Sequence, residues 1–281
     1  MGLSVMPVGA LILIMATALP ALSQSKPAKM GRVGCPHCVN DGSPISRSLQ
    51  RVDELYASFE TKEAHSELLK VLVLDPQNAE ALSKMARVYI DFADLIPESS
   101  PDWREKRNKE YRTAEDYARK AIQADPNSTW GHFYVAASLG SIASLSPIAK
   151  QIDLAGEIRA AVEKAIALDP QNGFAYHVYG IWHRKMAEIG KASRLFATVL
   201  YGRSIPRGSF EISIDYLQRA IALNPTVIAS RLELARSYAA IENWPLARHF
   251  LTSVRQLPIQ FSDDAKHKEK AEQLLEEIKE R

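Results

Sequence analysis

The motif A-I-A-L-D-P at residues 165–170 occurs four times in this chain with small variations. The other copies are V-L-V-L-D-P at 71–76, A-I-Q-A-D-P at 121–126 and A-I-A-L-N-P at 220–225. A proline inside a helix removes a hydrogen bond and clashes with the preceding turn, and it disfavours helical geometry in the residue before it. The four copies therefore predict four similar helix ends, and so a repeated helical unit.

The spacing of these motifs narrows the type of repeat. The prolines stand at positions 76, 126, 170 and 225, so the intervals are 50, 44 and 55 residues, and Pro258 follows after another 33. Tetratricopeptide repeats are helical hairpins with a period of 34 residues. The last unit fits this pattern, with Leu234, Ala235 and Tyr238 in the first helix and Ala247 in the second. The corresponding small residues of the other units are Ala86, Ala136 and Gly180.

Three units exceed the standard period, and we place the excess between their two helices. The expected insertions cover residues 97–101, 141–153 and 190–209. The stretch 262–281 predicts a polar C-terminal capping helix that starts with Ser262 or Asp263 as its cap. Residues 46–281 are thus expected to form an all-α domain, a tetratricopeptide-like helical-hairpin solenoid with long inter-helix insertions. A generic helical bundle with chance Asp-Pro stops is the alternative.

The N-terminal segment has the composition of a targeting signal. An almost uninterrupted apolar run covers residues 5–22, and no charged side chain occurs before Lys26. Small residues at Ala21 and Ser23 predict a signal peptide over residues 1–23 with cleavage before Gln24. The usual positively charged start is missing, however, and the run is long enough for a membrane anchor. We expect either an exported protein, periplasmic or secreted, or one anchored to a membrane by residues 5–22.

Both cysteines belong to C-P-H-C at residues 35–38, in a stretch rich in Gly, Pro and Ser that predicts a flexible linker over residues 24–45. A thiol-redox motif of this kind requires a strand before it and a helix after it, and the flanking residues predict neither. Two thiolates and His37 leave a zinc site incomplete. The sequence therefore leaves three roles open for Cys35 and Cys38. They are a local disulfide or unreactive thiols, a metal contact completed by a partner, and redox activity.

The spacing of residues in the sequence matches no common catalytic motif. The seven histidines form no i, i+4 pair with a nearby Glu in the metalloprotease arrangement, and no Gly-rich phosphate loop follows a predicted strand. The 35 Lys and Arg nearly balance the 33 Asp and Glu, which argues against a general nucleic-acid binder. We predict no enzyme, with no catalytic residue, metal or cofactor.

The inner groove of a repeat superhelix is lined by first-helix residues, and these predict a binding surface. Its middle is aromatic and apolar, with cations on one side. Such a surface suits an extended protein segment that carries an acidic group, or an anionic phospholipid at a membrane. Alternatively, the aromatic side chains pack against the insertions and fill the groove themselves. The predicted groove residues are Trp130, Phe133, Phe174, His177, Ile181, Arg184, Lys185 and Arg236.

Four stretches resemble the regulator of microtubule dynamics family. They are T-W-G-H-F-Y-V-A-A-S-L-G at 129–140, the segment 148–170, H-V-Y-G-I-W-H-R-K-M-A-E-I at 177–189 and the segment 210–225. The resemblance covers roughly residues 49–272. It implies a non-enzymatic tetratricopeptide-like fold, and for some animal members an N-terminal anchor, association with microtubules or organelle contact sites, and phospholipid binding. Bacterial relatives with export signals also exist.

We therefore predict a binding or scaffold protein that recognises a protein partner through the repeat groove and the insertions. A phospholipid-binding or lipid-transfer module at a membrane is the alternative, and a thiol-redox protein that uses Cys35 and Cys38 is a third hypothesis.

Overall fold

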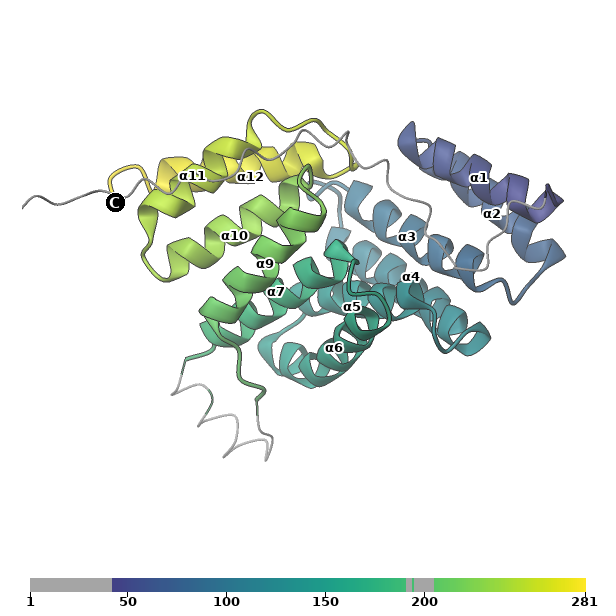
Figure 1. Cartoon of the computed structure of the whole chain (residues 1–281), viewed down its shortest axis with the longest axis horizontal. Coiled ribbons are helices and arrows are strands. Elements are labelled where there is room, and N and C mark those ends of the chain that lie inside the picture. Colours follow the sequence, from purple (N-terminus) through teal and green to yellow (C-terminus); the bar gives the residue numbers. More distant parts are fainter. Residues whose placement is uncertain (1–41, 191–193, 195–204) are drawn as a thin grey trace, which may run out of the picture.

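The computed structural model describes residues 42–190, 194 and 205–281, and these residues form eleven α-helices and no strand (Figure 1). The predicted targeting segment, Cys35 and Cys38 lie outside the described residues. The all-α prediction is confirmed for the part of the chain that the structure describes. The helices are α1 (Pro44–Ala57), α2 (Thr61–Leu74), α3 (Ala79–Leu95), α4 (Trp103–Ala124), α5 (Thr129–Ser144), α6 (Ile148–Leu168), α7 (Gly173–Glu188), α9 (Phe210–Leu223), α10 (Ile228–Ala240), α11 (Trp244–Val254) and α12 (Asp264–Glu277).

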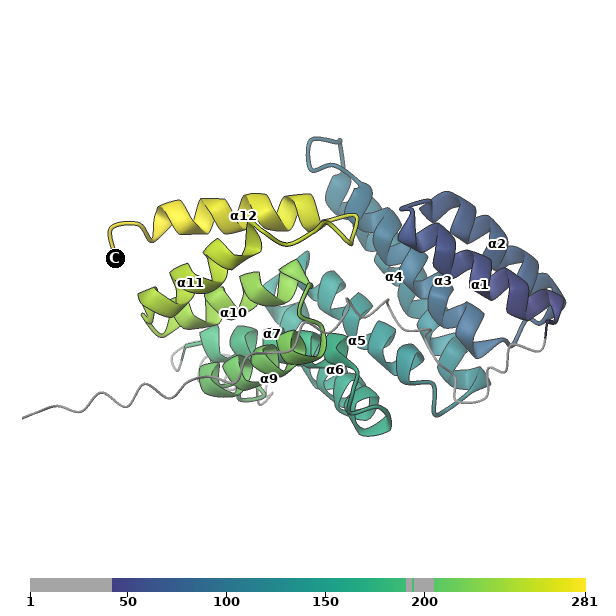
Figure 2. The same ribbon diagram turned by 45° about the horizontal axis from the view of Figure 1, so that its top comes forward.

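Successive helices pair as hairpins that stack side by side. The pairs are α1 with α2, α3 with α4, α5 with α6, α7 with α9, and α10 with α11, while α12 packs on α10 and α11 (Figures 1 and 2). This is the predicted helical-hairpin solenoid. The first hairpin begins at Pro44, two residues before the predicted start, because Ser43 caps it: its Oγ accepts from the N–H of Ser46 at 3.1 Å.

The repeated Asp-Pro and Asn-Pro motifs end helices at the predicted places, since α2, α4, α6 and α9 stop one residue before the Asp or Asn. The carboxylate at each Asp-Pro then accepts from the backbone two residues on, as Asp169 does from Gln171 at 2.9 Å. Asn172 next caps α7 by accepting from Ala175 at 3.1 Å. One short motif thus ends a helix, turns the chain and starts the next helix.

The excess length of the first two long units is mostly helix. Residues 97–101 do form a loop between α3 and α4, as predicted. The insertion predicted at 141–153 is wrong, however, because α5 continues to Ser144 and α6 begins at Ile148. The second helices are long instead, with 22 residues in α4 and 21 in α6.

The third predicted insertion, at 190–209, lies partly outside the described residues. Its ends approach each other, because the Arg194 guanidinium donates to the carbonyls of Ile205 and Pro206 at 3.1 and 3.0 Å. Arg194 Nε also donates to the Ile189 carbonyl at 2.9 Å. This side chain therefore ties the end of α7 to the segment that leads into α9.

Small residues allow neighbouring helices to pack closely, as the repeat pattern predicts. A Cβ added at Gly180 on α7 would lie 2.6 Å from Leu217 Cγ and 3.2 Å from the Ser213 carbonyl on α9. Ala86 and Ala136, at the equivalent positions of other units, are fully buried. Close helix approach at these positions is therefore a property of the sequence pattern.

Helix α12 covers the end of the solenoid with Ala271 and Ile278, which join the core of α10 and α11. The capping helix is thus confirmed, and Asp263 is its N-cap residue as predicted, although the Asp263 side chain makes no capping hydrogen bond. Asp264 acts instead on the preceding turn, where its Oδ2 accepts from the N–H groups of Gln260 at 2.7 Å and Phe261 at 2.9 Å. Lys266 in the first turn donates to the carbonyl of Asp94, at the end of α3.

Candidate functional site on the inner face of the repeats

The first helices of the hairpins are α1, α3, α5, α7 and α10; residues of α1, α3 and α7 lie against the loop before α12, α10 packs on α12, and α5 lies between α3 and α7. We call the surface of these first helices on the side of that loop the inner face. Its centre holds three of the predicted groove residues, Trp130, Phe133 and Phe174, which we call the aromatic floor. The Trp130 ring lies 5.4 Å from Phe133 and 6.1 Å from Phe174, between ring centroids. The structure therefore brings the predicted aromatic residues together.

The loop before α12 lies against this floor. The Phe261 ring is 6.0 Å from the Phe174 ring, and the Arg87 guanidinium carbon on α3 is 6.0 Å from the Phe261 ring and 4.0 Å from the Tyr56 ring. The space left between this loop and α1 and α3 measures only about 10 Å³. The chain thus fills this part of the inner face with its own residues. The alternative interpretation of the sequence also expected the groove to be filled from within the chain, but by the insertions and not by the loop before α12.

The predicted cations are paired within the chain. Arg184, which is 4 % exposed, and Arg236 both form ion pairs with Glu233 on α10. Lys185 is exposed and pairs with Glu188 at 3.1 Å. Burial raises the pKa of Glu233, but Arg184 and Arg236 outweigh this and hold it at about 2. Arg184 therefore joins α7 to α10, whereas Lys185 and Arg236 pair within their own helices. The predicted role of these cations in holding an anionic ligand is not favoured by this geometry.

The remaining predicted groove residues all lie on α7. His177 Nδ1 is 3.1 Å from Ser230 Oγ on α10, and burial lowers the pKa of His177 to about 4, so the ring is neutral at pH 7. Ile181 is half-buried one turn further on. His177 therefore bridges two first helices as a neutral polar contact.

Two carboxyl groups on α3 lie near the Phe261 segment: Asp91 lines the small space beside Phe261, and Asp94 follows about one turn later. The pKa of Asp91 is raised to about 7 and that of Asp94 to about 6, mainly by burial and with a smaller contribution from the charge of Asp263. Asp91 lies 3.8 Å from Arg87, and Tyr111 donates to Asp94 at 2.5 Å. Their i, i+3 spacing on a first helix was the available sequence signal.

The raised pKa of Asp91 predicts a pH-dependent stability. Its folded pKa of about 7 exceeds the ordinary Asp value of about 3.9, so its stabilising contribution is complete below about pH 4 and is lost as pH rises through 7. Asp91→Asn stays neutral, so we expect its gain in urea unfolding free energy over wild type to be about 2–3 kcal/mol larger at pH 8 than at pH 5. Equal free-energy differences at both pH values would contradict this account.

Asp263, Asp264 and His267 at the start of α12 are a candidate metal cluster, since one ligand atom of each lies within 4.8 Å of the others. Asp264 Oδ2 is already engaged by two backbone N–H groups, however, and His267 Nε2 lies 3.6 Å from Asp263. A helix N-terminus also carries a partial positive charge that disfavours a cation. We therefore assign these residues to the turn that places Phe261.

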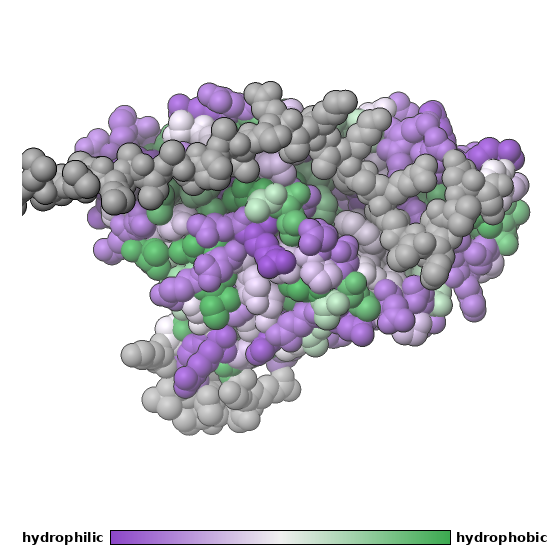
Figure 3. All heavy atoms as spheres, viewed as in Figure 1, coloured by the Kyte–Doolittle hydropathy of each residue, from purple (hydrophilic) through white to green (hydrophobic). Residues whose placement is uncertain are grey.

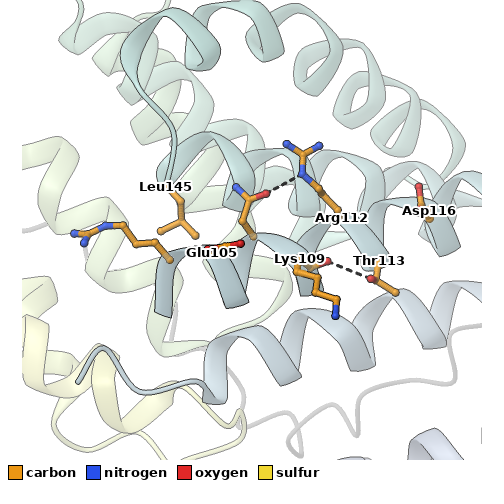
Figure 4. A pocket seen from close by; sticks show the side chains of 8 residues that line it. Glu105, Lys109, Arg112, Thr113, Asp116 and Leu145 are labelled. Atoms are coloured by element: carbon orange, nitrogen blue, oxygen red, sulfur yellow. Dashed lines mark hydrogen bonds between the residues drawn. The ribbon is translucent and has the colours of Figure 1, made fainter. Parts of the chain in front are cut away.

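A depression larger than the space beside Phe261 lies on α4 (Figure 4). It measures about 550 Å³ and has Leu145 as its one apolar lining residue. Its side chains carry both charge signs and bond along their own helix, for example Arg112 to Asn108 at 2.9 Å. This arrangement resembles a solvated helix surface more than a ligand site.

Two further observations bear on function. Outside the atoms drawn grey, Figure 3 shows hydrophobic residues in small separate patches among hydrophilic ones. No helix among the described residues is both long and apolar enough to cross a membrane.

The repeated hairpins and the lined inner face define a tetratricopeptide-like repeat protein. Solved structures of this class share the fold. A tetratricopeptide protein of Thermus thermophilus matches with a TM-score of 0.57 at 15% identity, over 82% of this chain and 98% of that one. PilW, a type IV pilus biogenesis factor, matches with a TM-score of 0.50 at 18% identity, over 85% and 94%.

Sequence comparison then gives the family. Residues 48–279 match the family described as regulator of microtubule dynamics protein 1-3, and the chain belongs to this family. Regulator of microtubule dynamics protein 1 of Bos taurus is 30% identical over 82% of this chain and 71% of its own length. Protein 3 of Xenopus laevis is 26% identical over 81% of this chain, which spans about half of that relative's length. The resemblance that the sequence motifs indicated is confirmed.

Proposed function

We propose that this chain is a non-enzymatic scaffold that recognises an extended segment of a partner protein on its inner face. The family and the repeat fold support the scaffold role. The observation that carries the proposal is that the aromatic floor already holds a non-helical segment of the chain itself, through Phe261. A surface that accepts one non-helical polypeptide segment has the chemistry to accept another.

The phospholipid alternative receives less support from the geometry. It was based on Arg184, Lys185 and Arg236 as a site for an anionic headgroup, and all three form ion pairs with Glu233 or Glu188. The names of the relatives refer to microtubule dynamics, so tubulin is one partner to test. Export or membrane anchoring through residues 1–23 remains a proposal from the sequence.

The test is capture of partners by the purified chain in the cells that produce it, with a chemical crosslinker and mass spectrometry. Phe174→Ser changes the aromatic floor, while Ile148→Ser changes a side chain that is 57% exposed at the start of α6. We expect partners to be retained by wild type and Ile148→Ser and reduced at least tenfold by Phe174→Ser. Equal capture by both variants would refute the proposal, and loss of a co-purified phospholipid alone would favour the alternative.

A further inference from the structure

We propose that residues 257–264 occupy, in cis, the seat of a partner segment in which an aromatic side chain is followed by a Lys or Arg. This inference rests on the proposed function and specifies the chemistry of the partner. It concerns the position of Phe261 and the position two residues later, where this chain has Asp263.

The seat for the aromatic ring is built from three helices. Phe174 on α7 contacts the edge of Phe261, Arg87 on α3 lies over its face, and Trp130 and Phe133 on α5 complete the floor. Aromatic pairs at these centroid distances and an Arg over a ring are both favourable for an aromatic ligand side chain. The seat therefore selects an aromatic residue.

The segment is held in this seat by few contacts. Its N–H groups at Gln260 and Phe261 bond to Asp264 within the same turn, so they do not depend on the inner face. Pro258 and Ile259 are exposed. Helix α12 is fixed separately, by Ala271 and Ile278 on α10 and α11. Leu257 packs on the same core, and its carbonyl accepts from Lys268 on α12 at 2.6 Å. Residues 258–263 can therefore leave the floor while Leu257 and α12 stay in place.

The charge beside the seat does not match the segment that fills it. Asp91 on α3 lines the space beside Phe261, and the first turn of α12 approaches the end of α3, since Lys266 donates to the backbone carbonyl of Asp94. Asp263 stands one turn before Lys266, and its charge raises the pKa of both Asp91 and Asp94. The positive charge of Arg87 lowers the pKa of Asp91, and those of Arg107 and Lys266 lower the pKa of Asp94. Both pKa values nevertheless stay above the ordinary value for Asp. The group that the structure places next to the Asp263 carboxylate is His267, at 3.6 Å. A cation at the position of Asp263 would instead add a positive charge near Asp91 and Asp94.

The experiment uses the full chain with Phe261→Ala, which empties the seat, and fluorescent peptides in trans. One peptide has the sequence of residues 257–264, and the second carries Asp263→Lys. We expect Phe261→Ala to bind the second peptide at least tenfold more tightly than the first by fluorescence anisotropy. Wild type should bind both peptides more weakly than Phe261→Ala does, because its own segment competes.

Two controls keep the outcome interpretable. Ile259→Ala, in the exposed part of the same segment, should bind like wild type, and a peptide with Phe261→Ala should not bind. If folded Phe261→Ala binds neither peptide, the proposed binding site for an aromatic side chain is contradicted. If it binds both peptides equally, the proposed preference for a cation two residues later is contradicted. Capture of partners that depends on Phe174 could still succeed in either case, so this failure is separable from failure of the proposed function.

Discussion

Glu233→Ala is expected to lower the free energy of unfolding by about 3 kcal/mol. Glu233 is 8 % exposed and pairs with both Arg184 and Arg236. Removing one partner of a buried ion pair leaves an uncompensated buried charge, which typically destabilises by about 3–5 kcal/mol. The expected loss is at the low end of this range because Glu188 remains beside Arg184. Urea denaturation at pH 7 measures the change.

The matched control is Glu188→Ala, since Glu188 pairs with the same Arg184 but its side chain is 38% exposed. We expect it to cost less than about 1 kcal/mol, as exposed pairs do. The double variant Arg184→Met with Glu233→Met should recover most of the lost stability, because a well-packed apolar pair can replace a buried ionic one. Equal losses for Glu188→Ala and Glu233→Ala would show that the pair does not stabilise the α7–α10 contact.

Trp182→Ala is expected to destabilise the chain by a similar or larger amount, about 3–4 kcal/mol. Trp182 on α7 is 4 % exposed, belongs to the main core, and its indole N–H donates to the Ala155 carbonyl on α6 at 2.9 Å. Replacing a buried Trp by Ala costs about 3–5 kcal/mol, because the transfer of apolar surface is lost and a cavity remains. Trp182 also joins two neighbouring repeats, so the solenoid cannot easily collapse around the gap.

Trp103→Ala provides the comparison for this prediction. Trp103 is half-buried at the start of α4, where Arg104 and Arg107 lie over its ring at 4.3 and 4.6 Å. We expect a loss of about 1 kcal/mol for Trp103→Ala, because its ring is only half-buried and its ring contacts are the two cation–π contacts with Arg104 and Arg107. If thermal or urea unfolding gives Trp182→Ala no larger effect than Trp103→Ala, the assignment of Trp182 to the inter-repeat core is wrong.

The fold could be predicted from the sequence because its signals are local. A proline ends a helix wherever it stands, so Pro170 and its counterparts marked the helix ends correctly. Gly180 and Ala235 likewise marked close helix contacts. The insertion at 141–153 was wrong because Ser, Pro and short apolar runs resemble a loop, whereas packing within the repeat extends α5 and α6 through most of it.

The candidate site could be predicted only in part. Trp130, Phe133 and Phe174 were found because the repeat geometry fixes which first-helix positions face inward. Arg184 and Glu233 are 49 residues apart, and no local pattern indicates that they meet. Phe261 lies outside any repeat, so its place on the aromatic floor depends on the path of the loop before α12.

Photo-crosslinking from the aromatic floor tests the central claim most directly. Benzoylphenylalanine replaces Phe174 in one variant and Ile212, an exposed residue on the second helix α9, in the other. In cells that produce the chain, we predict that position 174 forms adducts with residues 258–263 of the chain itself and with a partner polypeptide, and that position 212 forms neither. Partner adducts from position 212 with none from position 174 would contradict recognition on the inner face.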